Sequence, residues 1–218
     1  MKGLIIKDFS LLKNQKIFFI AIVILALITL IAGMDPMFIV SYTTLVLSMF
    51  TLSTLSYDEY DNGYPFLFSL PITRKTYVIE KYAFGFLISF GTWMVTLLLS
   101  TLYQLIKTSN FDIAAWLLSC AVFLVMIVFL NSLMIPLQLK FGGEKGKIAI
   151  FGVFIMVAIL GFVIAQVSEL LGIDWMLILN QLSNMNLYIL MAAVAGVAIL
   201  SVPISFAFSL KIMNHKQF

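Results

Sequence analysis

The chain has 218 residues, of which 62% are hydrophobic and 11% are charged, and its net charge is +3. So few charged groups could not solvate a water-soluble domain of this size, and the composition therefore predicts an integral membrane protein. The single cysteine, Cys120, excludes a disulfide framework and a cysteine-based metal site. We interpret it as a small, buried apolar side chain.

The first sixteen residues combine four lysines and one aspartate with apolar residues at near-helical spacing. This pattern predicts an amphipathic helix over residues 1–16 that lies at the membrane surface. The apolar run that follows lacks a good small-residue cleavage site, so we expect the first span to be retained rather than removed as a signal peptide.

Charge-free runs long enough to cross a membrane recur along the chain. Each is long enough to cross a hydrocarbon core of about 30 Å, which takes about 17–25 helical residues at about 1.5 Å per residue. The last run, 175–210, is too long for one helix and begins with polar residues, so we place a re-entrant or interfacial segment at 169–186 and the sixth span at 187–210. The first five runs are residues 17–34, 36–57, 82–106, 113–139 and 148–168. The expected fold is an all-α integral membrane protein with six spans in a single transmembrane domain, residues 1–218.

The basic residues are distributed unevenly over the two sides of this six-span arrangement. Six spans place both termini on one side, and that side receives twelve of the thirteen lysines and arginines. The other side has only Lys107. The positive-inside rule therefore predicts that both termini and the two basic loops are cytoplasmic.

The loop between the second and third spans, residues 57–82, contains seven charged residues together with many aromatic and apolar ones. A loop with so many apolar and aromatic residues is not fully solvated, so we expect it to pack against another surface. Gly63 and Pro65 mark a break, Pro71 disfavours a helix before it, and Thr73 is suited to begin the next helix. We predict a short amphipathic helix, a turn at residues 70–73 and a second helix that enters the third span.

The spans contain no acidic, basic or histidine side chain, which removes most support for a proton-coupled or sodium-coupled transporter. Their polar residues are hydroxyls and amides. These can hold helices together by hydrogen bonds or line a pathway, and the sequence leaves both interpretations open. The candidates for a substrate path are Thr44, Ser48, Thr51, Thr96, Gln104 and Asn131.

Catalytic patterns are missing from the sequence. His215 lies on a basic tail where a solvated side chain is expected, and no zinc motif or nucleophile elbow occurs. Residues 141–148, FGGEKGKI, approach a phosphate-binding loop, but Phe141 stands at the required first glycine and Ile148 at the required hydroxyl. We therefore expect no catalytic residue, and no metal or cofactor bound by this chain. If ATP drives the protein, another chain binds it.

The layout and one motif resemble a known family. The motif consists of YDE at residues 57–59, SLPITRK at 69–75 and EKY at 80–82. Together with six spans, an N-terminal interfacial helix and an irregular segment before the last span, it resembles the membrane subunits of ABC exporters of the second permease class. The layout covers the whole chain and the motif about 25 residues. This family includes half-size permeases that export phenol-soluble modulins, lantibiotics or bacitracin.

The resemblance implies a bacterial plasma-membrane protein that works with two ATPase subunits, which bind ATP and magnesium, and with a second permease chain, identical or different. It implies no nucleic-acid partner. The loop would be the coupling helix that docks on the ATPase, and the segment at 169–186 would form extracellular re-entrant helices. The residues expected to contact the ATPase are Phe66, Phe68, Leu70, Pro71, Ile72, Thr73, Arg74, Lys75, Glu80 and Lys81.

Two functions from different classes follow from these observations. The first is a permease that forms the translocation path of an ATP-driven exporter. The second is a membrane scaffold or sensor-associated protein that transports nothing and uses the same loop to hold a cytoplasmic partner; a membrane-embedded enzyme has the least support. An uncharged path with hydroxyl, amide, methionine and phenylalanine side chains suits an amphipathic or peptide substrate, but the sequence does not distinguish peptide from lipid, drug or ion.

Overall fold

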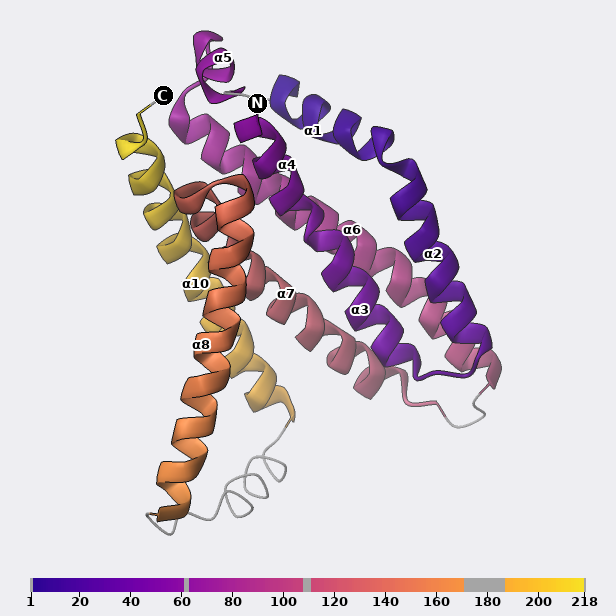
Figure 1. Ribbon diagram of the computed structural model, residues 1–218. Coiled ribbons are helices and arrows are strands. Elements are labelled where there is room, and N and C mark those ends of the chain that lie inside the picture. The colour runs from indigo at the N-terminus through magenta and orange to yellow at the C-terminus, as the bar shows by residue number, and fades with distance from the viewer. Residues whose placement is uncertain (1, 61–62, 108–110, 171–186, 218) are drawn as a thin grey trace.

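A computed structural model describes residues 2–60, 63–107, 111–170 and 187–217 (Figure 1). These residues form helices and contain no strand, which confirms the all-α fold. Among the described helices, five are long and apolar enough to cross a membrane, or six if one bent helix pair counts as a single span. The count agrees with a multi-pass membrane protein.

The bent pair lies at the N-terminus. It consists of α1 (Lys2–Asn14) and α2 (Lys16–Ile31), whose axes differ by 65°. In Figure 1, α1 lies across one end of the bundle and α2 runs along its side. The amphipathic N-terminal helix and the first apolar helix therefore occur where the sequence predicted them.

The second apolar run forms two helices, α3 (Pro36–Ser48) and α4 (Phe50–Glu59), separated at Met49. Asp35 caps α3, because its side chain accepts a hydrogen bond from the backbone N–H of Met37, and Pro36 occupies the first turn, where no backbone donor is needed. Residues 36–59 together are long enough for one span.

The central loop contains α5 (Gly63–Ser69), followed by the 34-residue helix α6 (Arg74–Lys107). The Thr73 hydroxyl accepts a hydrogen bond of 3.1 Å from the backbone N–H of Thr76, as expected of a residue that begins a helix. This confirms the predicted short helix, turn and second helix. The second helix continues into the third apolar run without a break.

The remaining described helices are α7 (Ile113–Phe141), α8 (Gly143–Leu170) and α10 (Leu187–His215). Gly142 separates α7 from α8 with φ near +80°, a conformation that glycine adopts without steric cost. Of the segment predicted to be re-entrant at residues 169–186, only the first two residues are described, as the end of α8. The rest lies outside the described residues.

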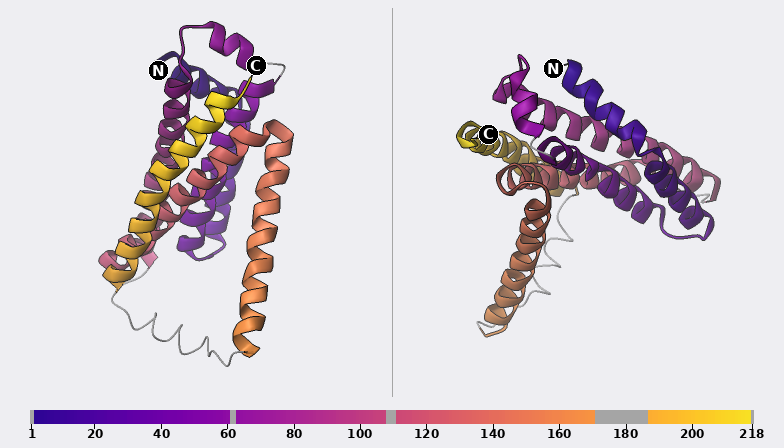
Figure 2. Two further views of the ribbon diagram at one scale, coloured as in Figure 1. Left: turned by 90° about the vertical axis from the view of Figure 1, so that its left-hand side faces the viewer. Right: turned by 45° about the horizontal axis from the view of Figure 1, so that its top comes forward.

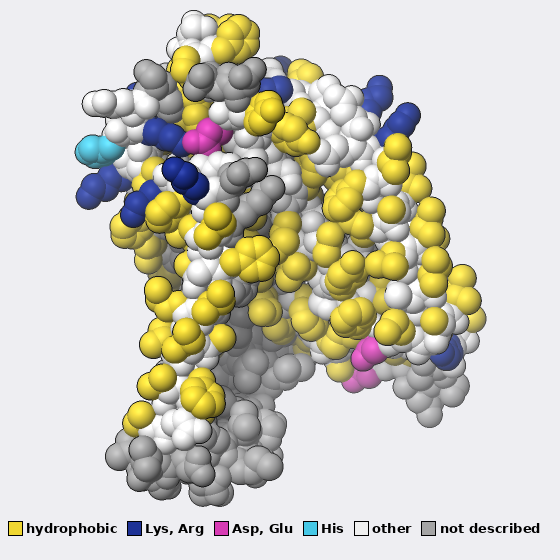
Figure 3. All heavy atoms as spheres, viewed as in Figure 1, with side chains coloured by type: hydrophobic (Ala, Val, Ile, Leu, Met, Phe, Trp, Pro, Cys, Tyr) yellow, Lys and Arg dark blue, Asp and Glu magenta, His cyan; other side chains and the backbone are white. Residues whose placement is uncertain are grey.

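Both termini, α5 and the connection between α7 and α8 lie at the same end of the molecule (Figures 1 and 2). Figure 3 shows most lysine and arginine side chains gathered there. We call this end, formed by residues 2–16, 57–60, 63–81, 140–147 and 211–217, the basic end.

The helices differ in how much of their surface other helices cover. Within residues 36–59, which form α3 and α4, 56% of the most apolar stretch is buried, whereas none of it is buried within residues 148–168 of α8. Figure 2 shows α8 diverging from the other helices away from the basic end. A helix that is apolar on all sides and uncovered by protein is typical of one surrounded by lipid.

An apolar core at the basic end joins segments that are far apart in the sequence. It contains residues from α1, α4, α5, α6, α7 and α10. Because all of these helices contribute side chains to one cluster, α5 has a fixed position on the bundle. The buried members are Leu4, Leu55, Tyr64, Leu67, Tyr77, Val78, Ile135, Leu139 and Met213.

Candidate functional site

The short helix α5 has a buried face and an exposed face. Tyr64 and Leu67 are buried, and the Tyr64 ring packs edge-on against Tyr77, with 5.9 Å between ring centroids. On the other face, Phe66 is 73% exposed, and Leu70, just beyond the helix, is 46% exposed. Large apolar side chains that are held rigidly and left uncovered are suited to contact another protein.

The residues expected to contact an ATPase fall into three groups. Phe66, Leu70, Pro71, Thr73 and Lys75 are exposed and lie together around α5 and the turn. A second group is half-buried, and its apolar members pack against the core of the basic end. This group consists of Phe68, Ile72 and Arg74.

The third group corrects the sequence-based expectation. Glu80 and Lys81 are fully buried, with no exposed side-chain surface, so neither can contact a partner in this structure. They lie one to two turns into α6, where other helices cover them. The sequence indicated exposure because the residues are charged and precede an apolar run, whereas Lys81 is neutralised inside the chain.

Lys81 lies at the centre of a buried ion cluster. Its ammonium group pairs with Asp8 of α1 and lies 2.8 Å from a carboxylate oxygen of Asp58 of α4. Lys7 pairs with the other oxygen of Asp58, and the Tyr77 hydroxyl donates a hydrogen bond of 3.0 Å to that carboxylate. Buried charges are tolerated only when they are paired and hydrogen-bonded, so this cluster fixes α1, α4 and α6 relative to one another.

The Glu80 carboxylate is less well paired than the ammonium group of its neighbour Lys81. The carboxylate lies 3.6 Å from the Lys81 ammonium group, and neither oxygen accepts a hydrogen bond from the residues that the structure describes. It is the third carboxyl group near Lys81, after Asp8 and Asp58, and burial raises its pKa to about 7.

Glu59, the neighbour of Asp58, joins α4 to the α7–α8 connection and to the C-terminal segment. One carboxylate oxygen accepts a hydrogen bond of 2.7 Å from the backbone N–H of Gly143, and the other pairs with Lys216 at 3.0 Å. A Cβ atom on Gly142 would lie 2.4 Å from this carboxylate, so only glycine fits here. The glycines that resembled a phosphate-binding loop in the sequence thus allow the α7–α8 connection to pass close to α4.

The C-terminal residues hold the loop that contains α5. The Lys216 ammonium group lies 4.7 Å from the centre of the Tyr64 ring and also donates to the Leu139 carbonyl. Arg74 donates a hydrogen bond to the carbonyl of Asn214. Burial raises the pKa of the Tyr64 phenol well above its usual value, so this side chain stays neutral beneath the lysine.

A groove of about 460 Å³ separates α5 from the first turns of α1. Leu4 and Lys7 line one side, and Phe66 and Leu70 line the other. The exposed apolar residues of the loop therefore border a concave surface in which Lys7 is paired with Asp58.

The structure does not bring the predicted substrate-path residues onto one surface. Thr44 and Thr96 meet between α3 and α6 with their hydroxyls 3.5 Å apart, and Thr51 packs against Gly85 of α6. The Ser48 hydroxyl donates to the Leu45 carbonyl of its own helix. These four side chains are buried, so they participate in helix packing here, which is the structural alternative that the sequence left open.

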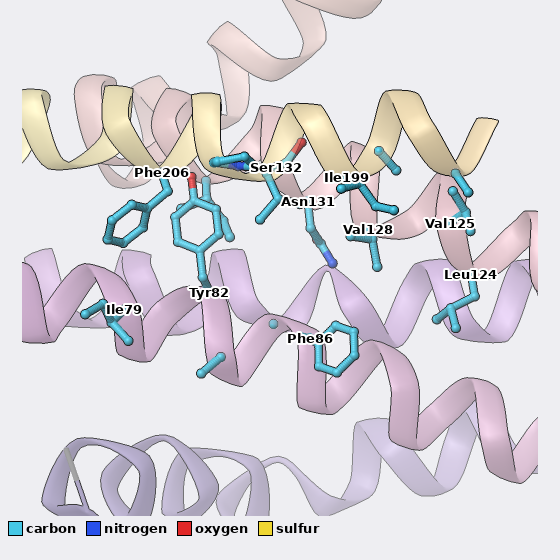
Figure 4. A pocket seen from close by; sticks show the side chains of 17 residues that line it. Ile79, Tyr82, Phe86, Leu124, Val125, Val128, Asn131, Ser132, Ile199 and Phe206 are labelled. Carbon is cyan, nitrogen blue, oxygen red and sulfur yellow. The ribbon is translucent and has the colours of Figure 1, made fainter. Parts of the chain in front are cut away.

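The two remaining path candidates lie elsewhere. Gln104 is half-buried near the end of α6 that is far from the basic end. Asn131 of α7 lies beside a cavity of about 800 Å³ between α6, α7 and α10, and its amide donates a hydrogen bond of 2.9 Å to Ser89 (Figure 4). Among the predicted path residues, only Asn131 lines this cavity.

Sequence reasoning missed the residues that hold the basic end together, namely Asp8, Asp58, Glu59 and Lys216. Asp8 was noted only as one charge on an amphipathic helix. Two features of the sequence could have indicated these contacts. Asp8 is the only acidic residue among the lysines of the first sixteen residues, and Lys81 directly precedes a long uncharged run.

Comparison with known families gives a match over almost the whole chain, because the profile of the ABC-2 family transporter protein matches residues 3–214. The chain belongs to this family. As an ABC-2 family protein it is a multi-pass permease component of an ABC transporter, and this membrane component is distinct from the ATPase. No curated protein and no solved structure matches the chain.

Proposed function

We propose that this ABC-2 protein forms the translocation path of an ATP-driven exporter and receives the motion of a separate ATPase subunit through α5 and the turn that follows it. The observation that carries this proposal is the combination of exposed Phe66 and Leu70 on one face of α5 with buried Tyr64 and Leu67 on the other. The exposed face offers a contact, and the buried face connects that contact to the bundle.

A loop can transmit motion only if it is held firmly to the helices that must move. Here Tyr64 packs on Tyr77 of α6, Lys216 of the C-terminal segment lies over Tyr64, and Arg74 bonds to Asn214. A displacement of α5 would therefore act directly on α6 and α10. We infer that these two helices move first when the ATPase subunits close.

The proposed assembly contains two permease chains, identical or different, and two ATPase chains that bind ATP and magnesium. The basic end faces the cytoplasm of a bacterial plasma membrane, which is supported by the twelve basic residues in the segments of this end. In this orientation α5 is accessible to a cytoplasmic ATPase.

The proposed substrate is an amphipathic molecule such as a peptide. The spans lack charged side chains, and the 800 Å³ cavity is lined mainly by apolar residues with a few hydroxyl and amide groups. Such surfaces accept varied apolar ligands and do not select a particular charged group.

The proposal is tested by Phe66→Asp and Leu70→Asp, which place a charge on the exposed face of α5 without changing any buried contact. Both variants should reach the membrane at wild-type levels, lose co-purification with the ATPase and lose transport. Phe141→Asp is the matched control, since Phe141 is a 43% exposed apolar residue at the same end of the bundle but outside the loop. It should retain both properties.

Wild-type ATPase binding and transport in both α5 variants would overturn the proposed coupling. The scaffold alternative makes a different prediction. It expects the variants to lose a cytoplasmic partner, while the wild-type complex shows no ATP-dependent movement of any peptide, lipid or drug across the membrane.

A further inference from the structure

The 800 Å³ cavity is a groove that follows three helices (Figure 4). The residues that line it recur about every three or four positions, as expected of one helix face: 79, 82, 83, 85 and 86 on α6, and 195, 198, 199, 202, 203 and 206 on α10. Phe86 is 52% exposed and Ile199 is 70% exposed. The groove therefore opens sideways, toward whatever surrounds these helices in the membrane.

The polar groups of the groove are already used within the chain. The Tyr82 hydroxyl bonds to Ser205 and, at 2.8 Å, to Ser209, so the side of its ring borders the groove. The Asn131 amide donates to Ser89, and Ser132 donates to Ser201. A water molecule needs two to four polar partners, so an apolar groove of this kind favours an occupant without hydrogen-bonding groups.

The groove has the length of one membrane leaflet. On α10 it extends from Ala195 to Phe206, which is about 16 Å at the rise of a helix and about half of a hydrocarbon core of about 30 Å. It lies toward the basic end, since Ile79 is only five residues from the start of α6. At that end the Tyr82 and Phe206 rings pack edge-on, with 5.7 Å between their centroids.

A positive charge stands just beyond this end of the groove. Lys75 is exposed and lies four residues before Ile79, so both residues are on the same face of α6, one turn apart. A lysine at this level is suited to meet the phosphate of a lipid headgroup whose hydrocarbon chain lies along the groove below it.

We propose that this groove binds one acyl chain of a phospholipid from the leaflet at the basic end. Apolar lining, a length of one leaflet, a lateral opening and a lysine at headgroup level together match this occupant. The inference does not depend on the proposed export function, because a bound lipid would be present whether or not the chain transports.

The test uses the full chain in phosphatidylglycerol–phosphatidylcholine vesicles that contain phosphatidylglycerol with a diazirine on one acyl chain. After illumination, mass spectrometry locates the labelled residues. Val128, on the α7 floor of the groove, should be labelled more strongly than Phe208, which is 60% exposed on α10 and does not line the groove. Contact with bulk lipid alone would give the opposite order, since Val128 is the less exposed residue.

Filling the groove provides the matched comparison. Val202→Trp and Ile199→Trp add volume inside the groove, and the second tolerates it more easily because Ile199 is largely exposed. Both should remove most of the label from Val128 and leave Phe208 unchanged. Ile204→Trp, on the same helix but outside the groove, should change neither.

Two results would overturn the proposal. One is labelling of Val128 that is weaker than that of Phe208 and unaffected by the filling variants. The other is a second copy of the chain in the groove, which would appear as a disulfide-linked dimer of the variant Val125→Cys together with an unlabelled floor.

Discussion

The basic end and the membrane-spanning part of this ABC-2 protein are held together by different kinds of contact. At the basic end, α1, α4 and α6 share the buried charges of Lys81, Asp8 and Asp58. Between the spans, the polar contacts include hydroxyl and amide pairs, such as Thr44 with Thr96 and Asn131 with Ser89. The comparison teaches that this chain has its strong, charged contacts at the basic end and weaker, neutral polar contacts between the spans. The end that would receive motion is therefore the end at which buried charges join α1, α4 and α6.

The largest effect is expected for Lys81→Met, which removes the shared cation and leaves the buried carboxylates of Asp8 and Asp58 with the partly exposed Lys7 as their one cationic partner among the described residues. The free energy of unfolding should fall by about 3–5 kcal/mol, the usual cost of breaking a buried pair. Reversible unfolding in mixed micelles measures this change. In the double variant Lys81→Met, Asp8→Asn, the loss should be smaller than the sum of the two single losses. Additive losses would show that the cluster is not a coupled unit.

A smaller effect is expected for Glu59→Gln. The amide can still accept the hydrogen bond from Gly143, but the ion pair with Lys216 is lost. Because both partners are partly exposed, the free energy of unfolding should fall by only about 1.5 kcal/mol. Lys216→Met should give a similar value by the same measurement. An effect as large as that of Lys81→Met would remove the contrast between the two sides of α4.

Between the spans, Asn131→Ala should reduce the free energy of unfolding by about 1 kcal/mol, since hydrogen bonds between membrane helices contribute about 0.6 to 1.7 kcal/mol. Ser89→Ala should reduce it by a similar amount, and the double variant by less than the sum, because both residues belong to one hydrogen bond. If these variants reduced the free energy of unfolding by more than Lys81→Met and Glu59→Gln do, the strongest contacts would lie between the spans and not at the basic end.

The smallest effect is expected for Thr44→Val. This change preserves shape, and the lost contact to Thr96 is long, at 3.5 Å. The expected loss is below about 0.5 kcal/mol. Thr44→Leu, which adds volume where α3 meets α6, is a suitable contrast and should destabilise the protein more by overpacking. Equal values for valine and leucine would mean that the two helices are not closely packed here.

The sequence predicted the helices well because hydropathy and capping are local properties. Asp35, Thr73 and Asp112 cap the helices that follow them, and each apolar run became helical wherever it is described. The break between α3 and α4 at Met49 was not predicted, since neither a proline nor a glycine marks it.

The candidate site was predicted only in part, for a physical reason. Phe66 of α5 and Leu70, just beyond this helix, are exposed, but Lys81 was assigned to a surface because its partners could not be recognised. Asp8 is 73 residues away from Lys81 along the chain, and Lys7 is 51 residues from Asp58. Hydropathy shows where charges occur, but only the three-dimensional packing shows which of them neutralise one another.

Asp58 and Glu59 have a geometric consequence that arises from their being neighbours on one helix. Successive residues of an α-helix point about 100° apart, so the two carboxylates face different sides of α4. Asp58 reaches α1 and α6, and Glu59 reaches the α7–α8 connection and the C-terminal segment. The last turn of α4 is therefore connected on two sides, and a rotation of this helix about its own axis would displace both sets of partners at once.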